Sequence, residues 1–215
     1  LPGSRTDEVR RHLPLMLAAA RQIAWDMPGV QFLVLKAPSV PRAVLDAPLS
    51  RADVKVSVAE GRNREVLQVL DAAIVASGTA TLETALMGVP MAVVYRTSWP
   101  TYVAARLVLR IPHIALVNVI AGEPVVPEFV QHRAQPKRIA TAIIELLRSE
   151  ERRAQMKEAL QRQVKDRLGE PGAVEEGVPA GVERGVRGVK GLVVLEVRGG
   201  GGEAGVGDEQ GAELV

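Results

Sequence analysis

The feature that most constrains this chain is a series of short apolar segments that alternate with helical patterns over residues 1 to about 117. Segments 31–37, 73–76 and 91–95 are four to seven residues long, rich in Val, Ile and Leu, and bounded by Gly, Pro or Ser. Such runs are typical of strands buried on both faces, and parallel sheets need helices between their strands. The pattern therefore predicts an α/β fold, a Rossmann-like parallel sheet with helices on both faces.

The full set of expected elements follows from the same reading. The expected strands are 31–37, 54–58, 73–76, 91–95 and 114–117. The expected helices are 8–27, 42–47, 63–70, 79–87, 100–109, 136–148 and 150–168. Thr6 or Asp7 is the expected cap of the first helix, and Pro28-Gly29 ends it.

The chain changes character after residue 168. Residues 169–215 hold fourteen of the twenty glycines, mostly among Val and Glu. Such a stretch buries too little apolar surface to offset its chain entropy, so we expect a disordered tail, and a change of reading frame is a second explanation for it. Residues 192–197 could form a strand, but the sequence indicates no partner for it. We therefore predict a binding domain over residues 1–168 and a disordered tail over 169–215.

The start of the chain also carries information. A Pro-Gly-Ser-Arg loop followed directly by a helix is normally preceded by a strand in a βα unit. Only Leu1 precedes the loop here. We therefore expect the chain to begin inside a domain.

Composition excludes several classes of function. There are no cysteines and three scattered histidines, which argues against disulfides and against zinc clusters. No apolar run approaches the ~20 residues needed to cross a bilayer, so the chain is expected to be soluble and cytoplasmic. Aromatic residues make up 3% of the chain and no recognised motif is present, which makes nucleic-acid binding the weakest hypothesis.

Charge is unevenly spread along the chain. Residues 169–215 contain four Lys or Arg against nine Asp or Glu, so the body carries the basic excess. A basic body suits phosphate-bearing ligands or an anionic membrane surface, and it is equally common in proteins that bind neither. The basic excess within 136–168 fits docking on anionic lipid, or a solvated helix pair with alternating charges.

Two loops have the composition of phosphate cradles. Gly3 permits close backbone approach, Ser4 offers a hydroxyl and Arg5 offers a planar fork for phosphate oxygens, ahead of a helix N-terminus. The alternative is a plain loop with a cap. The second loop, Ser77-Gly78-Thr79, follows a buried strand and precedes a helix in the same way, and the alternative there is an N-cap.

Glu83 lies one helical turn past Thr79, where its carboxylate could accept hydrogen bonds from a ribose diol; a solvated or paired Glu is the alternative. Two cradles in one α/β domain favour a nucleotide diphosphate at the carboxyl edge of the sheet. Neither loop matches the dinucleotide G-x-G-x-x-G pattern or the P-loop, so the sequence contains neither of the motifs that usually indicate NAD or ATP binding.

A third polar segment follows the last expected strand. Asn118, Glu128 and Gln131 could read sugar hydroxyls or a base edge, although Asn118 is equally typical of a turn.

Taken in order, these motifs resemble the C-terminal half of lipid-A-disaccharide synthases. The resemblance covers residues 1–168 and rests on an ordered set whose members are weak singly. The set comprises Leu1-Pro2-Gly3-Ser4-Arg5-x-x-Glu8, Gly61-x-x-Arg64-Glu65, Ala76-Ser77-Gly78-Thr79-Ala80-Thr81-Leu82-Glu83, Pro90-Met91-x-Val93-x-Tyr95-Arg96, Asn118-x-x-Ala121-Gly122 and Pro127-Glu128-x-x-Gln131.

The resemblance implies a GT-B glycosyltransferase that needs no metal or other cofactor. It implies transfer of 2,3-diacylglucosamine from UDP-2,3-diacylglucosamine to 2,3-diacylglucosamine 1-phosphate with inversion, giving lipid A disaccharide 1-phosphate and UDP. Gly3, Ser4, Arg5 and the 77–79 loop would face the diphosphate and Glu83 the ribose. Asn118, Glu128 and Gln131 would line the cleft or a subunit contact.

The resemblance places the catalytic base in an N-terminal domain outside this sequence, so no catalytic residue is assigned and the chain alone is expected to be inactive. It also allows peripheral contact with the inner face of the inner membrane and a homodimer of the full-length enzyme. Two alternatives stay open: a UDP-binding module acting with a separately encoded catalytic half, and another GT-B-like enzyme such as a UDP-sugar epimerase or the peptidoglycan glucosaminyltransferase.

Overall fold

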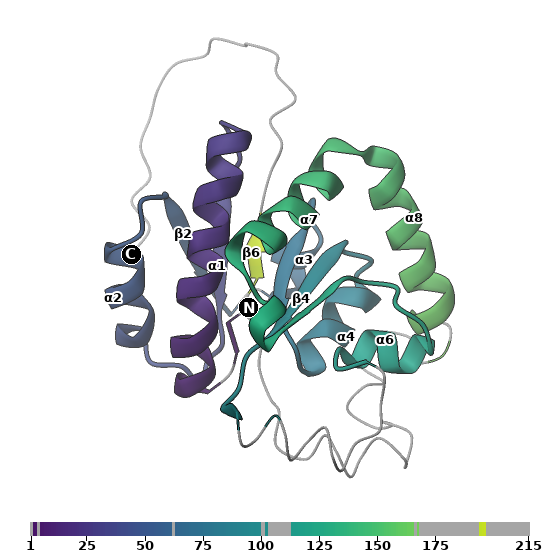
Figure 1. Ribbon diagram of the computed structural model, residues 1–215, viewed down its shortest axis with the longest axis horizontal. Coiled ribbons are helices and arrows are strands. Elements are labelled where there is room, and N and C mark those ends of the chain that lie inside the picture. The colour runs from purple at the N-terminus through teal and green to yellow at the C-terminus, as the bar shows by residue number, and fades with distance from the viewer. Residues whose placement is uncertain are drawn as a thin grey trace.

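The computed structural model of the chain is a single sheet between two layers of helices (Figure 1). It describes residues 2–3, 5–61, 63–99, 102, 113–165, 167 and 194–196. Within these residues the sheet has six strands in the order β2-β1-β6-β3-β4-β5. The strands are β1 (Phe32–Lys36), β2 (Val56–Glu60), β3 (Ala73–Ala76), β4 (Met91–Tyr95), β5 (Glu128–Val130) and β6 (Val194–Glu196).

Five of these strands run in one direction. β1 pairs with β2, β3 with β4, and β4 with β5, all in parallel. All four residues of β3 and four of the five in β4 are buried, as expected for strands covered on both faces. This arrangement confirms the predicted α/β, Rossmann-like fold.

One helical layer contains α1 (Thr6–Asp26), α2 (Ala43–Ser50) and α7 (Pro136–Arg148), in which α1 packs between the other two. The other contains α4 (Thr79–Leu86), α6 (Leu116–Ala121) and α8 (Glu150–Leu160), the last continued by one π-helical turn, η2 (Gln161–Lys165). The short helix α3 (Asn63–Leu67) joins β2 to β3, and the 3-10 turn η1 (Gln131–Arg133) follows β5.

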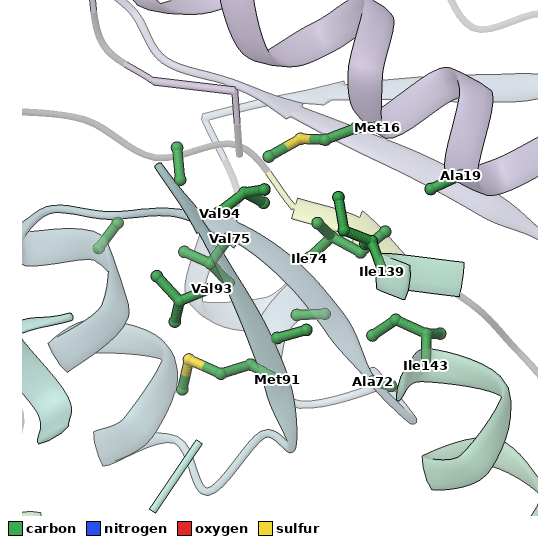
Figure 2. Close-up of a cluster of buried hydrophobic side chains, with 14 of the residues drawn as sticks. Met16, Ala19, Ala72, Ile74, Val75, Met91, Val93, Val94, Ile139 and Ile143 are labelled. Atoms are coloured by element: carbon green, nitrogen blue, oxygen red, sulfur yellow. The ribbon is translucent and has the colours of Figure 1, made fainter. Parts of the chain in front are cut away.

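Aliphatic side chains from three elements meet between α1, α7 and the sheet. Figure 2 shows Met16 of α1 and Ile139 and Ile143 of α7 on the side of the sheet toward which Ile74 and Val94 point. All of these side chains are almost completely buried. Burial of a side chain of this size stabilises the fold by roughly 1.5–3 kcal/mol. Helix α7 has a clean apolar stripe because Ile139, Ile143 and Leu146 recur at helical spacing.

The predicted strand at 114–117 is wrong. Residues 116–121 form α6 instead, and β5 lies where the sequence reading expected a polar loop. A short apolar run has no periodicity that separates a strand from a buried helix. Here the backbone N–H groups of Ile114 and Ala115 donate to the Glu128 carboxylate, at 2.9 and 3.1 Å, rather than to a neighbouring strand.

Other boundaries differ less. Arg5, rather than Thr6 or Asp7, is the N-cap residue of α1, and α3 ends at Leu67 rather than residue 70. The expected helix at 100–109 lies outside the described residues apart from Tyr102.

Strand β6 was expected to have no partner, and this is wrong. It pairs antiparallel with β3 over three residues, and its Leu195 lies opposite Val34 of β1. It thereby takes the central sheet position that a strand leading into the 2–5 loop and α1 would take in a βα unit. The rest of the predicted tail, 169–193 and 197–215, lies outside the described residues.

Candidate functional site

The loops that carry the predicted site residues meet at one edge of the sheet. Parallel strands end at a common edge, and ligands of open α/β sheets bind there, at helix N-termini. β3 ends at Ala76, before Ser77 and α4. β4 ends at Tyr95 beside β5, which ends at Val130. The first turn of α1 belongs to the same edge because His12 of that helix contacts Arg96, just after β4.

Gly3 is required by the geometry of the first loop. Its φ of +122° lies in a region that L side chains rarely adopt, and a Cβ atom there would lie 2.5 Å from Cβ of Glu8. The same Glu8 accepts the Arg5 N–H at 3.4 Å, which holds the loop against the first turn of α1. Arg5 is exposed. Ser4, the third predicted ligand residue of this loop, lies outside the described residues.

His12 joins this loop to the loop after β4. Its Nδ1–H donates to the Pro2 carbonyl at 3.1 Å, and its Nε2 accepts the Arg96 N–H at 2.9 Å. The residue is 2% exposed, and this burial lowers its pKa to about 4 despite the opposing effect of the Pro2 carbonyl. The imidazole is therefore neutral at physiological pH, as its acceptor role toward Arg96 requires.

The 77–79 loop continues β3 into α4. The Ser77 N–H donates to Val94 O at 2.9 Å, and its hydroxyl donates to Ile114 O at 3.0 Å. Gly78 is buried, and its carbonyl accepts both the N–H and the hydroxyl of Thr81. Thr79 begins α4 and, like Glu83, is half-buried. The structure thus places a helix N-terminus directly behind this loop, as the sequence predicted.

Asn118 and Glu128 face each other and bind backbone. Asn118, fully buried, exchanges two hydrogen bonds with the backbone of Val126, at 2.8 and 2.9 Å. Its Nδ2 also donates to Glu128 Oε1 at 2.7 Å. Because the Glu128 carboxylate accepts the Ile114 and Ala115 N–H groups as well, the pair fixes the segment that leads into α6.

Gln131 clamps the loop after β4. Its Oε1 accepts the Thr97 N–H at 3.3 Å, and its Nε2 donates to Thr97 O at 3.0 Å. It has a φ of +48°, the one positive value among the described non-glycine residues, and is 7% exposed. A backbone conformation of this kind persists where the surrounding structure demands it. Here the buried side-chain amide holds the backbone of Thr97.

An open cavity of about 710 Å³ lies beside this cluster. Its lining includes Tyr102, His113, Glu128, His132 and Arg133. His113 Nδ1 lies 3.7 Å from Glu128 Oε1. The volume falls in the range of small-molecule sites, and the lining combines apolar residues with polar side chains and one arginine, Arg133.

Sequence reasoning missed His12 and Arg96 as site residues. Two signals were present: a single histidine at position 12, on the apolar face of a helix, where a satisfied core histidine is the ordinary interpretation, and Arg96 at the end of the Pro90–Arg96 motif, to which no role was assigned. The tertiary contact to Arg96 bridges 84 positions of sequence and has no local signature.

Within the described residues, no cluster of three or more His, Cys, Asp or Glu side chains could hold a metal ion. In the same part of the chain, no helix is long and apolar enough to cross a membrane.

The sequence profile of the lipid-A-disaccharide synthetase family matches residues 1–176, more than three quarters of the chain. The chain belongs to this family. A lipid-A-disaccharide synthase of Anaeromyxobacter dehalogenans strain 2CP-C is 45% identical over 174 residues, which cover 80% of this chain and 45% of that protein. The synthase of Syntrophus aciditrophicus is 42% identical over 176 residues, 81% of this chain and 46% of the relative.

The synthase of Myxococcus xanthus is 40% identical over 183 residues, 85% of this chain and 48% of the relative. The chain thus spans less than half the length of the curated synthases it matches. The family profile ends at residue 176, so β6 lies outside the matched region.

Proposed function

We propose that this chain forms the UDP-sugar-binding half of a lipid-A-disaccharide synthase. The observation that carries the proposal is the position of two glycine-containing loops, each followed by a helix N-terminus, beside the end of β4 at the carboxyl edge of the sheet. Backbone N–H groups at helix N-termini favour phosphate groups, and the strands of such a sheet direct a nucleotide to this edge. Membership of the synthase family supports a glycosyltransferase that acts in lipid A biosynthesis.

In this proposal the sugar donor is UDP-2,3-diacylglucosamine and the acceptor is 2,3-diacylglucosamine 1-phosphate. The acceptor 6-hydroxyl attacks the anomeric carbon, the bond from that carbon to the β-phosphate oxygen breaks, and UDP leaves with inversion. The proton of the hydroxyl passes to a base, which we expect in the N-terminal half of the enzyme. The role of this chain is to bind the UDP portion and to stabilise negative charge on the leaving diphosphate.

The residues take distinct roles. Gly3, Ser4, Arg5 and the Ser77-Gly78-Thr79 loop face the diphosphate, and Glu83 accepts hydrogen bonds from the ribose. For Asn118, Glu128 and Gln131 the internal hydrogen bonds described above favour positioning over direct ligand contact. Each holds backbone of a loop at the binding edge.

Calorimetric titration of UDP into the purified chain tests the proposal, with Glu83→Gln as the variant. Glu150, an exposed residue in the first turn of α8, provides the matched control Glu150→Gln. Saturable binding that is weakened in the Glu83 variant and retained in the control is the expected result. A folded chain that binds no UDP would contradict it.

A second experiment tests whether catalysis requires the N-terminal half of the enzyme. Because the chain spans less than half of its relatives, catalysis is expected only after addition of a synthase N-terminal half, and the chain alone should be inactive. Activity restored by a separately produced N-terminal half would favour a two-chain enzyme. Docking on the inner membrane and homodimer formation stay predictions for the full-length protein.

A further inference from the structure

The backbone just after β4 is held by side chains from two other elements. His12 of α1 binds the Arg96 N–H, and Gln131 of η1 binds both the N–H and the carbonyl of Thr97. Three side-chain hydrogen bonds therefore fix two consecutive loop residues. Ordinary surface loops are not held this way, because their backbone groups bond to water.

Both anchoring side chains are buried, which is costly for polar groups unless they are fully bonded. His12 and Gln131 are 2% and 7% exposed. His12 donates to Pro2 and accepts from Arg96, so both ring nitrogens are satisfied, and the ring links those two backbone groups. The loop after β4 is thereby fixed to the loop that contains Gly3 and Arg5.

This fixed backbone carries an exposed arginine. Arg96 is exposed and, among the residues that the structure describes, forms no ion pair with a carboxylate. By contrast, Arg42, the N-cap residue of α2, forms ion pairs with both Asp46 and Glu60. A cation left without a counter-charge, on a rigid loop at the nucleotide edge, is available to an anionic ligand.

We propose that Arg96 is a further diphosphate-binding residue and that His12 is a positioning residue, which directs Arg96 toward the phosphates. This inference rests on the proposed function. The guanidinium fork matches two phosphate oxygens, a geometry that a lysine cannot reproduce. With Arg5 on the adjoining loop, it would place two cations where charge accumulates as UDP departs.

Titration of UDP and of uridine into the full chain tests the role of Arg96. Arg96→Gln should weaken UDP binding roughly 10- to 100-fold, the usual effect of a lost hydrogen bond to a charged group, and leave uridine binding unchanged. Arg96→Lys should recover part of the loss. Arg51, an exposed arginine at the C-cap of α2, provides the control. Arg51→Gln should bind both ligands with the affinity of the parent.

The positioning role of His12 has its own readout. His12→Leu should weaken UDP binding in the parent and have no further effect in the Arg96→Gln background, because both changes remove the same interaction. His12→Gln, which keeps an acceptor for the Arg96 N–H, should recover affinity. Urea unfolding of each variant identifies any that fails to fold.

The outcomes separate the two proposals. If the parent binds UDP and Arg96→Gln binds it as tightly, the Arg96 inference is overturned and the proposed function stands. If Arg96→Gln weakens UDP and uridine equally, the residue does not act on phosphate. If His12→Leu weakens UDP binding by the same factor in both backgrounds, His12 does not act through Arg96. A folded parent chain that binds neither ligand overturns both proposals.

Discussion

Glu128→Gln is the substitution that best separates a structural role from direct ligand binding at the third polar segment. The Glu128 side chain is 15% exposed and accepts three hydrogen bonds: from Ile114 N–H at 2.9 Å, from Ala115 N–H at 3.1 Å and from Asn118 Nδ2 at 2.7 Å. Glutamine has the same shape but one acceptor fewer. Whichever way its amide turns, an NH₂ group then faces at least one of these donors.

The size of the effect follows from those contacts. A hydrogen bond to a charged group contributes about 1.5–3 kcal/mol, and leaving a buried donor unsatisfied costs about 1–3 kcal/mol. Part of the network survives, because the amide oxygen still accepts on one side. We therefore expect Glu128→Gln to lower the free energy of unfolding by about 2–4 kcal/mol.

Equilibrium urea unfolding measures this directly, as a lower midpoint at unchanged slope. Glu150→Gln, at an exposed position in the first turn of α8, is the matched control and should cost less than about 1 kcal/mol. If Glu128→Gln unfolds with the stability of the parent yet no longer binds UDP, the carboxylate is a ligand group and the structural reasoning is wrong.

Three further predictions concern other parts of the fold. Gly3→Ala should destabilise the chain by about 2 kcal/mol or more, because its φ is positive and the new Cβ would collide with Glu8. Gly29→Ala is the control and should cost less, because its Cβ would meet nothing within 4 Å. Thermal unfolding compares the two variants. The pKa of His12 falls from 6.5 to about 4 on folding, so between these pH values His12 is protonated in the unfolded chain and neutral in the folded one. The free energy of unfolding should therefore fall by about 3 kcal/mol as the pH drops from above 6.5 to 4. Urea unfolding at several pH values measures this decrease, and the part due to His12 should be absent in His12→Leu. Deleting residues 169–215 removes β6 and leaves facing edges of β1 and β3 unpaired, so it should lower the unfolding midpoint in urea; an unchanged midpoint would show that β6 contributes nothing.

The parts of the fold that the sequence predicted well are those with local signals. The bounds of β3, β4 and α7 agree with the predicted ranges, because each is an apolar run or stripe between clear Gly, Pro or Ser boundaries. The error at 114–117 has the opposite cause. That segment is apolar without a period, and its conformation depends on Glu128, more than ten positions away.

β6 shows the same limit on a larger scale. Its pairing with β1 joins residues 34 and 195, and no local pattern near either indicates the other. The roles of the side chains at the site could not be predicted from the sequence either. A polar residue after a strand has the same sequence signature whether it binds a ligand or, like Gln131, a neighbouring backbone.

The buried polar residues of the described chain fall into two groups. Thr81 and Thr84 bond to carbonyls of their own helix or its cap. The other four bond to loop backbone: His12 to residues 2 and 96, Lys36 to residues 37 and 40, Asn118 to residue 126 and Gln131 to residue 97.

The net gain from a satisfied buried hydrogen bond is small, about 0.5–1.5 kcal/mol, but an apolar residue at any of these four positions would leave backbone groups of a loop without a partner. What the polar side chains add is order in loops that would otherwise sample many conformations. A loop ordered before the ligand arrives loses less entropy on binding, and this raises affinity without a new contact. Substitutions at these positions should therefore weaken nucleotide binding through loop order, even where the side chain never touches the ligand.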